Sequence, residues 1–357
     1  MNLDPNLVNR RLQDWYTVHF RPLPWRIDAS PYHVWVSEIM LQQTRIEAVI
    51  PYYHRFISAL PDIKALADVD TEVLLKLWEG LGYYSRARNL KKAAQIVVDD
   101  FGGIIPADYD ILLSLPGVGE YTAGAIASIA FSLPVPAVDG NVMRVLARLT
   151  ADDTDVLSTR GKKRFTDLAW QLVPEQGAGR FNQALMELGE TVCVPKSPRC
   201  ESCPLRFECV AHLNNTVNLF PVRIKKTRRR IESRAVAVVL VKNSPHKVLI
   251  HKRGVDGLLA DLWELPNTLE SDAIDSLPTD LQVHCRFVKN LPEAKHLFSH
   301  IEWRMRANLY VADNVGDLPP DYYAATLSEL QSGFPLPGAF RAYTALFPEL
   351  LKKENEI

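Results

Sequence analysis

Four cysteines lie close together just past the midpoint of the chain. They follow the pattern Cys-x6-Cys-x2-Cys-x5-Cys, and prolines separate them; the cysteines are Cys193, Cys200, Cys203 and Cys209. A short segment bent by proline can bring four thiolates to one metal centre, but it cannot join distant parts of a fold. Because the N-terminus has no apolar signal core, the pattern favours metal binding over disulfides. Zinc and a cubane iron–sulfur cluster both accept four thiolates, and the spacing leaves both open.

Length and composition indicate a globular protein of two or three domains. The chain has 357 residues, of which 47% are hydrophobic, and a formal net charge of −1. This charge excludes a histone-like cationic binder, but not a nucleic-acid enzyme whose basic residues cluster on one face. The sequence has no run of 18 apolar residues, so we expect a cytoplasmic protein without a membrane partner. Cys285 lies apart in a strand-like stretch and is expected to be an inert, half-buried thiol.

The first half of the chain has helical periodicity from about residue 5 to 192. Ser30 followed by Pro31 predicts a capped helix start, with the helix running toward Leu60. The same pattern predicts further helices over 71–79, 85–100, 121–131, 142–150 and 161–173. We therefore expect an all-α first domain.

The second half changes to a period of two after a basic run. Six cations occupy residues 223–230, which indicates either a solvated linker or a linker that follows a phosphate backbone. Alternation predicts strands over 234–241, 247–251 and 301–311, and a closing helix over 338–352. We expect a helical domain over 1–212, a basic linker over 213–231 and a smaller α+β domain over 232–350.

Two polar breaks interrupt the apolar helices of the first domain. In Leu115–Gly119, the turn formed by Gly117, Val118 and Gly119 can present backbone N–H groups to a phosphate, or it can be a tight turn between packed helices. Twenty residues later, Asp139 precedes the next helix and could simply cap it.

These motifs together resemble a known superfamily. Leu115–Gly119 is similar to the helix-hairpin-helix of base-excision DNA glycosylases, residues 138–142 resemble their catalytic-aspartate loop, and the cysteine spacing is that of their [4Fe–4S] loop. Residues 24–26, 31–44 and 78–86 resemble the MutY family of adenine DNA glycosylases more specifically. The resemblance covers nearly the whole chain, because the C-terminal part is similar to that family's Nudix-like lesion-recognition domain. It implies an iron–sulfur cluster rather than zinc at the four cysteines.

Two carboxylates are the candidate catalytic groups. Cleavage of an N-glycosidic bond needs a proton for the leaving base and stabilisation of an oxocarbenium-like sugar, which two carboxylates in different environments provide. Apolar residues flank Glu38, and burial there would raise its pKa; the alternative is the wet edge of an amphipathic helix. The resemblance assigns Glu38 the general-acid role and Asp139 the stabilisation of the sugar cation. Asn141 would position a water molecule or orient the carboxylate.

Tyr121 predicts the reaction subtype. Bifunctional relatives similar to endonuclease III place a nucleophilic lysine at this hairpin position, whereas this chain has Glu120 and Tyr121 there. A hydrolytic glycosylase without a true lyase step is therefore expected, with Tyr121 as a catalytic-site residue.

The resemblance also implies roles for the residues around the reacting base. An extruded adenine would be bordered by Trp25, Arg26, Leu41 and Gln183. The resemblance assigns intercalation and probing of the mispair to Gln42, Gln43, Leu81 and Tyr83. It assigns lesion recognition to Phe298, Ser299 and His300. The implied partner is duplex DNA with adenine opposite 8-oxoguanine or guanine, bound by a monomer.

The second domain lacks one feature of catalytic Nudix proteins. After Trp263–Pro266 the sequence does not contain the Arg-Glu-x-x-Glu-Glu helix that holds magnesium, so nucleotide hydrolysis is not expected. Two alternative functions remain. One is an endonuclease III-like glycosylase for another base, and the other is a non-enzymatic iron–sulfur DNA-binding protein in which Glu38 and Asp139 are structural.

Overall fold

The computed structural model describes residues 3–224, 229–242, 245–269 and 283–351. It divides into two compact units. Unit 1 comprises Met1–Asp68 and Asn89–Lys226, and unit 2 comprises Val69–Arg88 and Thr227–Ile357. Residues 69–88, which the sequence analysis places in the helical domain, are thus grouped with the C-terminal residues.

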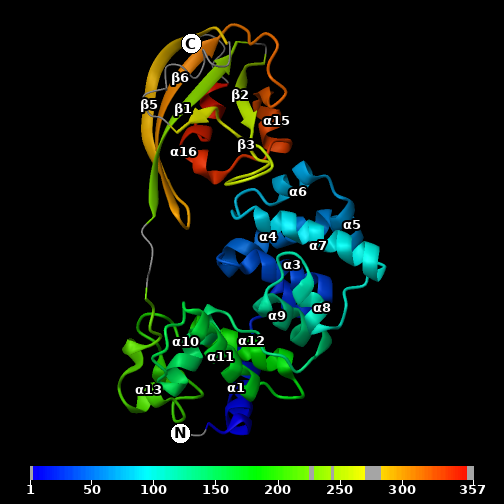
Figure 1. The fold of residues 1–357 in the computed structure, drawn as a ribbon, viewed down its shortest axis with the longest axis vertical. Helices are drawn as coiled ribbons and strands as arrows, with labels where there is room; N and C mark the ends of the chain where they lie inside the picture. The colour runs from blue at the N-terminus through cyan, green and yellow to red at the C-terminus, as the bar shows by residue number, and fades with distance from the viewer. Residues whose placement is uncertain (1–2, 225–228, 243–244, 270–282, 352–357) are drawn as a thin grey trace. The chain divides into compact units, whose positions relative to one another are not determined.

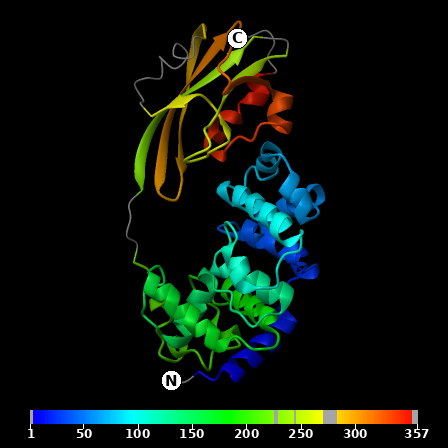
Figure 2. The ribbon, with the colours of Figure 1, turned by 45° about the vertical axis from the view of Figure 1, so that its right-hand side comes forward.

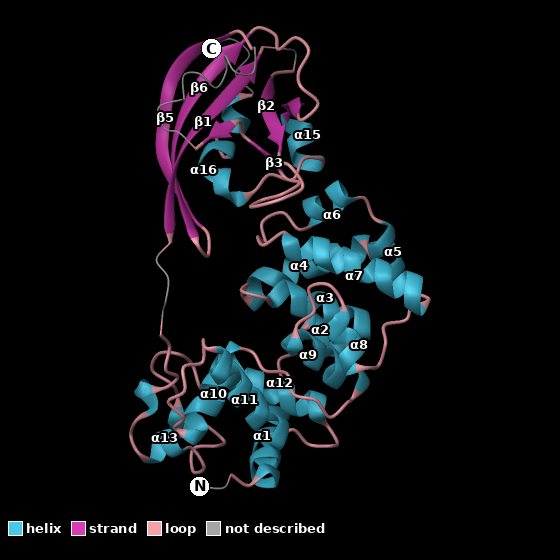
Figure 3. Ribbon diagram, in the orientation of Figure 1, coloured by secondary structure: helices cyan, strands magenta, loops and turns pink. Residues whose placement is uncertain are grey.

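Unit 1 is built from helices (Figures 1 and 3). Buried apolar residues, among them Leu12, Val142 and Phe181, form a core between them. Its helices are α1 (Pro5–His19), α2 (Pro24–Ile27), α3 (Pro31–Leu41), α4 (Ile46–Ala59), α5 (Ile63–Asp68), most of α7 (Ser85–Phe101), α8 (Tyr109–Ser114), α9 (Glu120–Phe131), α10 (Gly140–Thr150), α11 (Thr159–Leu172), α12 (Ala178–Thr191) and α13 (Val210–Leu213). Short 3-10 turns follow at Cys200–Ser202 and Val217–Leu219. The helices predicted from periodicity are confirmed apart from the one that begins at Pro31.

The helix predicted from Pro31 toward Leu60 is wrong as a single element. Helix α3 ends at Leu41, where Gln42 leaves helical geometry with ψ 110°, and α4 starts at Ile46. Gln43 has a φ of 60°, a left-handed conformation that ends a helix and that side chains rarely adopt. The break places Glu38 in the last turn of α3 and the two glutamines in the turn that follows.

Unit 2 contains a twisted mixed sheet in the order β3-β2-β1-β6-β5 (Figures 1 and 2). The strands are β1 (Arg230–Val241), β2 (Lys247–Lys252), β3 (Trp263–Glu264), β4 (Asn267–Thr268), β5 (Cys285–Leu297), β6 (Ile301–Ala312) and β7 (Tyr322–Thr326). The unit also contains α6 (Thr71–Leu77), α15 (Leu327–Ser332), α16 (Arg341–Thr344) and α17 (Phe347–Leu350). The central pair, β1 and β6, is parallel, and β5 pairs antiparallel with β6.

The predicted alternation is confirmed in the first half of β6, residues 301–306, whereas residues 307–312 are all buried. Ile301, Trp303 and Met305 are buried, whereas Arg304 and Arg306 are exposed. The buried face packs against Phe340, Tyr343 and Phe347 from the C-terminal helices, which lie on one face of the sheet in Figures 1 and 2. Asn308, which strict alternation would place on the exposed face with Arg304 and Arg306, is buried and donates to the Tyr310 hydroxyl at 3.2 Å.

The closing helix predicted over 338–352 is also wrong as one element. The chain forms a 3-10 turn at Gly338–Phe340 and then two short helices, because Pro348 restricts the chain to a new helix start at α17. Residue 352 lies outside the described residues. Of the basic run, Arg230 already belongs to β1, and residues 225–228 are not described. In the described part of the chain, no helix is long and apolar enough to cross a membrane.

Candidate active site

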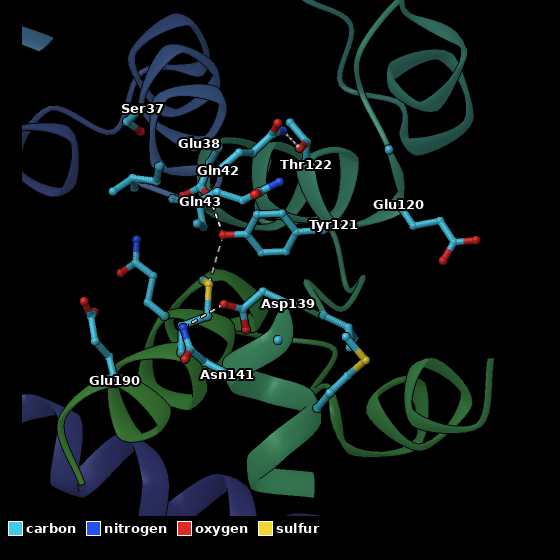
Figure 4. A pocket seen from close by; sticks show the side chains of 18 of the residues that line it. Ser37, Glu38, Gln42, Gln43, Glu120, Tyr121, Thr122, Asp139, Asn141 and Glu190 are labelled. Carbon is cyan, nitrogen blue, oxygen red and sulfur yellow. Dashed lines mark hydrogen bonds between the residues drawn. The ribbon is translucent and has the colours of Figure 1, made fainter. Parts of the chain in front are cut away.

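A cavity of about 1260 Å³ in unit 1 brings most of the sequence-predicted residues together. Residues from helices far apart in sequence line it, and they include Trp25, Arg26, Glu38, Leu41, Gln42, Gln43, Gly119, Tyr121, Asp139, Asn141 and Gln183. Figure 4 shows Glu38 and Tyr121 on one side of the cavity, with Asp139 and Asn141 on the other. The predicted carboxylates therefore face one space large enough for a base and its sugar.

Glu38 is buried in the wall of this cavity. Only 5% of the residue is exposed, so burial raises its pKa to about 7, and the nearby Asp139 carboxylate raises it as well. The hydrogen bond from Tyr121 and the charge of Arg26 act in the opposite direction. The expected desolvation is confirmed, and this carboxyl can hold a proton near neutral pH.

Tyr121 connects Glu38 to the opposite side of the cavity. It lies in the first turn of α9, and its hydroxyl donates a hydrogen bond to a Glu38 carboxylate oxygen and lies 3.4 Å from the Met186 sulfur. Burial and the neighbouring carboxylates raise the pKa of Tyr121 well above its usual value. The phenol therefore remains a donor that fixes the rotamer of Glu38.

Asp139 caps α10 and is held by its neighbours. One carboxylate oxygen accepts from the Val142 N–H at 2.7 Å, and the other accepts from the Asn141 side chain at 2.9 Å. Burial raises the pKa of Asp139, while these hydrogen bonds and the charge of Arg144 oppose that rise. The capping interpretation and the catalytic interpretation are thus compatible, because the cap fixes a carboxylate that faces the cavity.

Arg144 extends this network to the cysteine segment. Its guanidinium donates to Asn141 Oδ1 at 2.8 Å, to the Gly189 carbonyl at 2.7 Å and to the Cys193 carbonyl at 2.8 Å. Asn141 orients the Asp139 carboxylate, so three consecutive hydrogen bonds, through Arg144 and Asn141, connect the start of the cysteine loop to Asp139. Arg144 is not among the sequence-predicted residues, since nothing local indicates these distant acceptors.

Asn182 is a second supporting residue that sequence reasoning missed. It is buried on α12, accepts from the Ala137 N–H at 3.2 Å and donates to the Val135 carbonyl at 2.9 Å. The same stretch packs on α9 where Gly124 stands, and a Cβ there would lie 2.0 Å from the Pro136 carbonyl oxygen. These contacts hold the segment that leads into Asp139.

The expected adenine-pocket residues differ in how tightly they are held. Arg26 pairs with the buried Glu187 at 2.8 Å, which also binds Arg21. Gln183 accepts from the Tyr16 hydroxyl at 3.1 Å, and Trp25 packs edge-on against Tyr53. Glu187 was not predicted. As a buried carboxylate it fixes the cation that lines the cavity.

The Gly117–Gly119 turn has the geometry of a helix start open to a ligand. Gly117 has a φ of 78° and a Cβ there would meet Asn89 at 2.7 Å, so this position requires glycine. Val118 is buried, whereas Gly119 is the exposed N-cap of α9 with no atom within 4 Å of where a Cβ would lie. The N–H groups of α9 are therefore accessible at this end.

The four cysteine thiols lie close enough to influence one another. Burial and, to a smaller extent, the other three cysteines together raise the pKa of Cys203 to about 12. The fully buried Arg148 donates to Cys193 Sγ at 3.3 Å and to the carbonyls of Val194 and Pro195. Within the described residues, no three or more His, Cys, Asp and Glu side chains form a group that could hold a metal ion.

The remaining predicted residues belong to unit 2. Tyr83 is 46% exposed and has a φ of 49°, whereas Leu81 is buried. Ser299 and His300 are exposed in the turn between β5 and β6, and Phe298 packs against Trp303 with ring centroids 4.9 Å apart. Left-handed backbone at a non-glycine residue is concentrated at functional sites. Gln43 and Tyr83, both expected to probe the duplex, have it, as do six other non-glycine residues in the described part of the chain.

Family models match both parts of the chain. Residues 36–175 match the HhH-GPD superfamily of base excision DNA repair proteins, and residues 236–346 match the NUDIX domain.

Curated relatives extend the match to most of the chain. It is 37% identical to the adenine DNA glycosylase of Buchnera aphidicola, over 81% of this chain and 81% of the relative. It is 38% identical to that of Rattus norvegicus, over 84% of this chain and 69% of the relative. The chain belongs to the adenine DNA glycosylase family. The family member of Arabidopsis thaliana is 37% identical over 87% of this chain, which spans only 58% of that longer protein.

Solved structures place the helical part of this adenine DNA glycosylase family member in the same fold as other glycosylases. A thermostable thymine-DNA glycosylase is 28% identical with a TM-score of 0.54, over 59% of this chain and 97% of that chain. A non-covalent endonuclease III–DNA complex is 26% identical with a TM-score of 0.50, over 60% of this chain and 99% of that chain. The expected helix-hairpin-helix glycosylase fold with a C-terminal Nudix-like domain is confirmed.

The raised pKa of Glu38 predicts a pH-dependent stability. The pKa of this carboxyl is raised from 4.5 to about 7, so the folded state binds the proton more tightly than the unfolded chain. The contribution of Glu38 to stability is therefore present below about pH 4.5 and is lost as pH rises to about 7. The Glu38→Gln variant should be more stable than wild type at pH 8, with the difference shrinking toward pH 5. Urea unfolding of both proteins across this range measures the difference; a constant difference would contradict the raised pKa.

Proposed function

We propose that the chain is a monofunctional DNA glycosylase that hydrolyses the N-glycosidic bond of adenine opposite 8-oxoguanine or guanine in duplex DNA. It acts as a monomer in base excision repair. Membership in the adenine DNA glycosylase family supports the reaction class. The observation that carries the proposal is the buried Glu38, whose pKa is raised to about 7, facing the capped Asp139 across one cavity.

The two carboxyl groups divide the chemistry between them. Glu38 is protonated over part of the neutral range and donates that proton to the departing adenine, which leaves as a neutral base. The Asp139 carboxylate stabilises electrostatically the positive charge that develops on the sugar. A water molecule then adds to the anomeric carbon, and the proton that it loses passes to the Glu38 carboxylate, which restores the acid. Asn141 and the Val142 N–H hold Asp139 in that orientation. Arg26 keeps a positive charge beside Glu38 and borders the base.

Extraction of the base uses the turns at the ends of the short helices. Gln42 and Gln43 border the cavity and can bond a base edge, while the exposed Tyr83 ring offers a flat surface to stack in the duplex. The Gly119 end of α9 binds a backbone phosphate. Phe298, Ser299 and His300 form the lesion-reading loop, in which Ser299 and His300 are presented to solvent.

A glycosylase assay tests this function. Duplexes with adenine opposite 8-oxoguanine, guanine or thymine are incubated with the full chain, and alkali-labile sites are counted. We expect the fastest excision opposite 8-oxoguanine and slower excision opposite guanine. Removal of a pyrimidine instead would support the endonuclease III-like alternative, and DNA binding without excision would support the non-enzymatic one.

Borohydride trapping tests the monofunctional subtype. Residue 121 is a tyrosine and cannot form an imine with the sugar, so we expect little covalent adduct and none mapped to the start of α9. Lys162 and Lys163 on α11 also line the cavity, and Lys163 pairs with Asp167 at 2.8 Å. Strong trapping would contradict the proposal, and the variants Lys162→Ala and Lys163→Ala would show whether α11 supplies the amine.

We further propose that the four cysteines hold a [4Fe–4S] cluster. Although the described side chains do not form a metal-holding group in this structure, the donor set supports the proposal, because it consists of four thiols, as a cubane requires. The buried Arg148 cation beside Cys193 Sγ would complement the negative charge of ligating thiolates. When bound, the group fixes the 193–209 loop. Arg148 and Arg144 connect that loop to α10, the helix capped by Asp139.

Iron content provides the check on this cofactor. The purified protein should be yellow-brown and contain about four irons per chain. Cys200→Ser should lower the iron content and the affinity for DNA. It should lower the single-turnover rate of adenine excision from bound DNA to a smaller extent. A colourless, fully active protein with one zinc per chain would show that the cysteines hold zinc instead.

A further inference from the structure

Unit 2 contains a segment that lies, in the sequence, among the helices of the first half of the chain. This probe segment, residues 69–88, comprises α6, the loop that carries Tyr83, and the start of α7. It makes specific polar contacts with the C-terminal residues of the same unit.

Lys76 makes the central contact. Its ammonium group donates to Glu79 at 2.7 Å, to the Leu330 carbonyl at 2.8 Å and to the Phe334 carbonyl at 3.2 Å, so all three N–H donors are used. Leu330 lies in α15, and Phe334 lies two residues beyond its end. The cation therefore satisfies carbonyls at the C-terminus of a helix, where a positive charge is favourable.

Glu79 completes a two-sided contact with the 330–336 segment. One carboxylate oxygen accepts from the Leu336 N–H at 2.8 Å, and the other accepts from Lys76. Further polar contacts lie on either side of this pair: Glu72 pairs with Lys252, and Arg88 donates to the Ala260 carbonyl at 2.8 Å. The α6 helix is thus held at several points by the domain that carries Ser299.

Side-chain hydrogen bonds hold the loop between α6 and α7, so its position follows that of α6. Its glycines, Gly80 and Gly82, and Tyr83 have positive φ. The Trp78 indole donates to the Gly82 carbonyl at 3.2 Å, and Arg86 donates to the carbonyls of Leu81 and Gly82 at 3.1 and 3.0 Å. At the tip, the Tyr83 hydroxyl lies 2.9 Å from Ser299 Oγ.

We propose that Lys76 and Glu79 are positioning residues that hold α6 on the 330–336 segment and thereby place Tyr83 beside Ser299. The preference for adenine opposite 8-oxoguanine over adenine opposite guanine then depends on this contact, although neither side chain reads the lesion. The inference rests on the proposed function. It deepens that function by assigning specificity to a pair of charges outside both the cavity and the 298–300 loop.

The test uses the full chain and the variants Lys76→Met and Glu79→Ala. Lys64→Met, on the exposed surface of α5, is the matched control for loss of one lysine charge. The excision-rate ratio for adenine opposite 8-oxoguanine and opposite guanine is measured at matched salt. We expect this ratio to fall by about tenfold in both variants, the range for loss of a charge-assisted hydrogen bond. The ratio should be unchanged in the control.

Hydrogen exchange at the Leu336 amide gives a readout independent of activity. This N–H bonds to Glu79, so Glu79→Ala should accelerate its exchange, while amides in the β1–β6 pair stay protected and show that unit 2 remains folded. Faster exchange with a lower ratio supports the proposal. Faster exchange with an unchanged ratio, or exchange that does not respond to Glu79→Ala, overturns it. A wild type that removes no adenine would overturn the proposed function instead, and the exchange result would still decide whether the contact exists.

Discussion

Replacing Glu38 with glutamine is expected to lower the rate of adenine excision by about 10²- to 10⁴-fold, the contribution typical of general acid catalysis. Glutamine preserves the size of the side chain and an oxygen that can accept from Tyr121, but it cannot supply a proton. Affinity for the mispair should survive, since the change removes neither a cation nor a stacking group. Single-turnover excision and equilibrium binding of the same duplex measure the two effects separately.

The pH profile provides the control for this assignment. In the wild type, the excision rate should decline as pH rises through about 7, because Glu38 then loses its proton. Tyr121→Phe removes the hydrogen bond that favours the ionised carboxylate, so the decline should move to higher pH. Near-normal turnover by Glu38→Gln, or a decline that Tyr121→Phe leaves in place, would mean that another group supplies the proton.

Asp139→Asn should lower excision by a factor of at least about 10², because it removes the negative charge that faces the developing sugar cation. The substitution should leave the stability of the fold unchanged, because it keeps the N-cap of α10. Asparagine is as effective as aspartate at an N-cap, so its side-chain oxygen can still accept from the Val142 N–H. Thermal unfolding should therefore remain close to that of the wild type while activity is lost.

Asp152→Asn is a matched control for the loss of one aspartate charge. Asp152 also accepts from a backbone N–H, that of Thr154 at 2.9 Å, but it lies outside the cavity lining. Asp152→Asn should leave excision unchanged. Loss of activity in Asp139→Asn that is matched by a large fall in melting temperature would indicate a structural role and would count against Asp139 as the stabiliser of the sugar cation.

Local sequence determined several features correctly, because each depends on residues close together in the chain. Alternation predicted which side of β6 is buried over residues 301–306, since successive side chains in a strand point to opposite faces, but both faces are buried from residue 307 on. Apolar neighbours of Glu38 left burial and a wet helix edge both open, and the structure shows burial with a raised pKa. Asp139 before an apolar helix predicted the cap on α10. The break after Leu41 was missed because no glycine or proline marks it.

Only the tertiary structure decided how these local features meet. Tyr121 bonds to Glu38 across 83 positions of sequence, and Arg144 reaches the Cys193 carbonyl across 49. The contact between Lys76 and the Leu330 carbonyl spans 254. Periodicity indicates which face of a helix or strand is apolar, but it does not indicate which distant side chain packs beside a given donor. Such pairs form only when helices pack, and packing depends on the shapes of all the side chains at the contact.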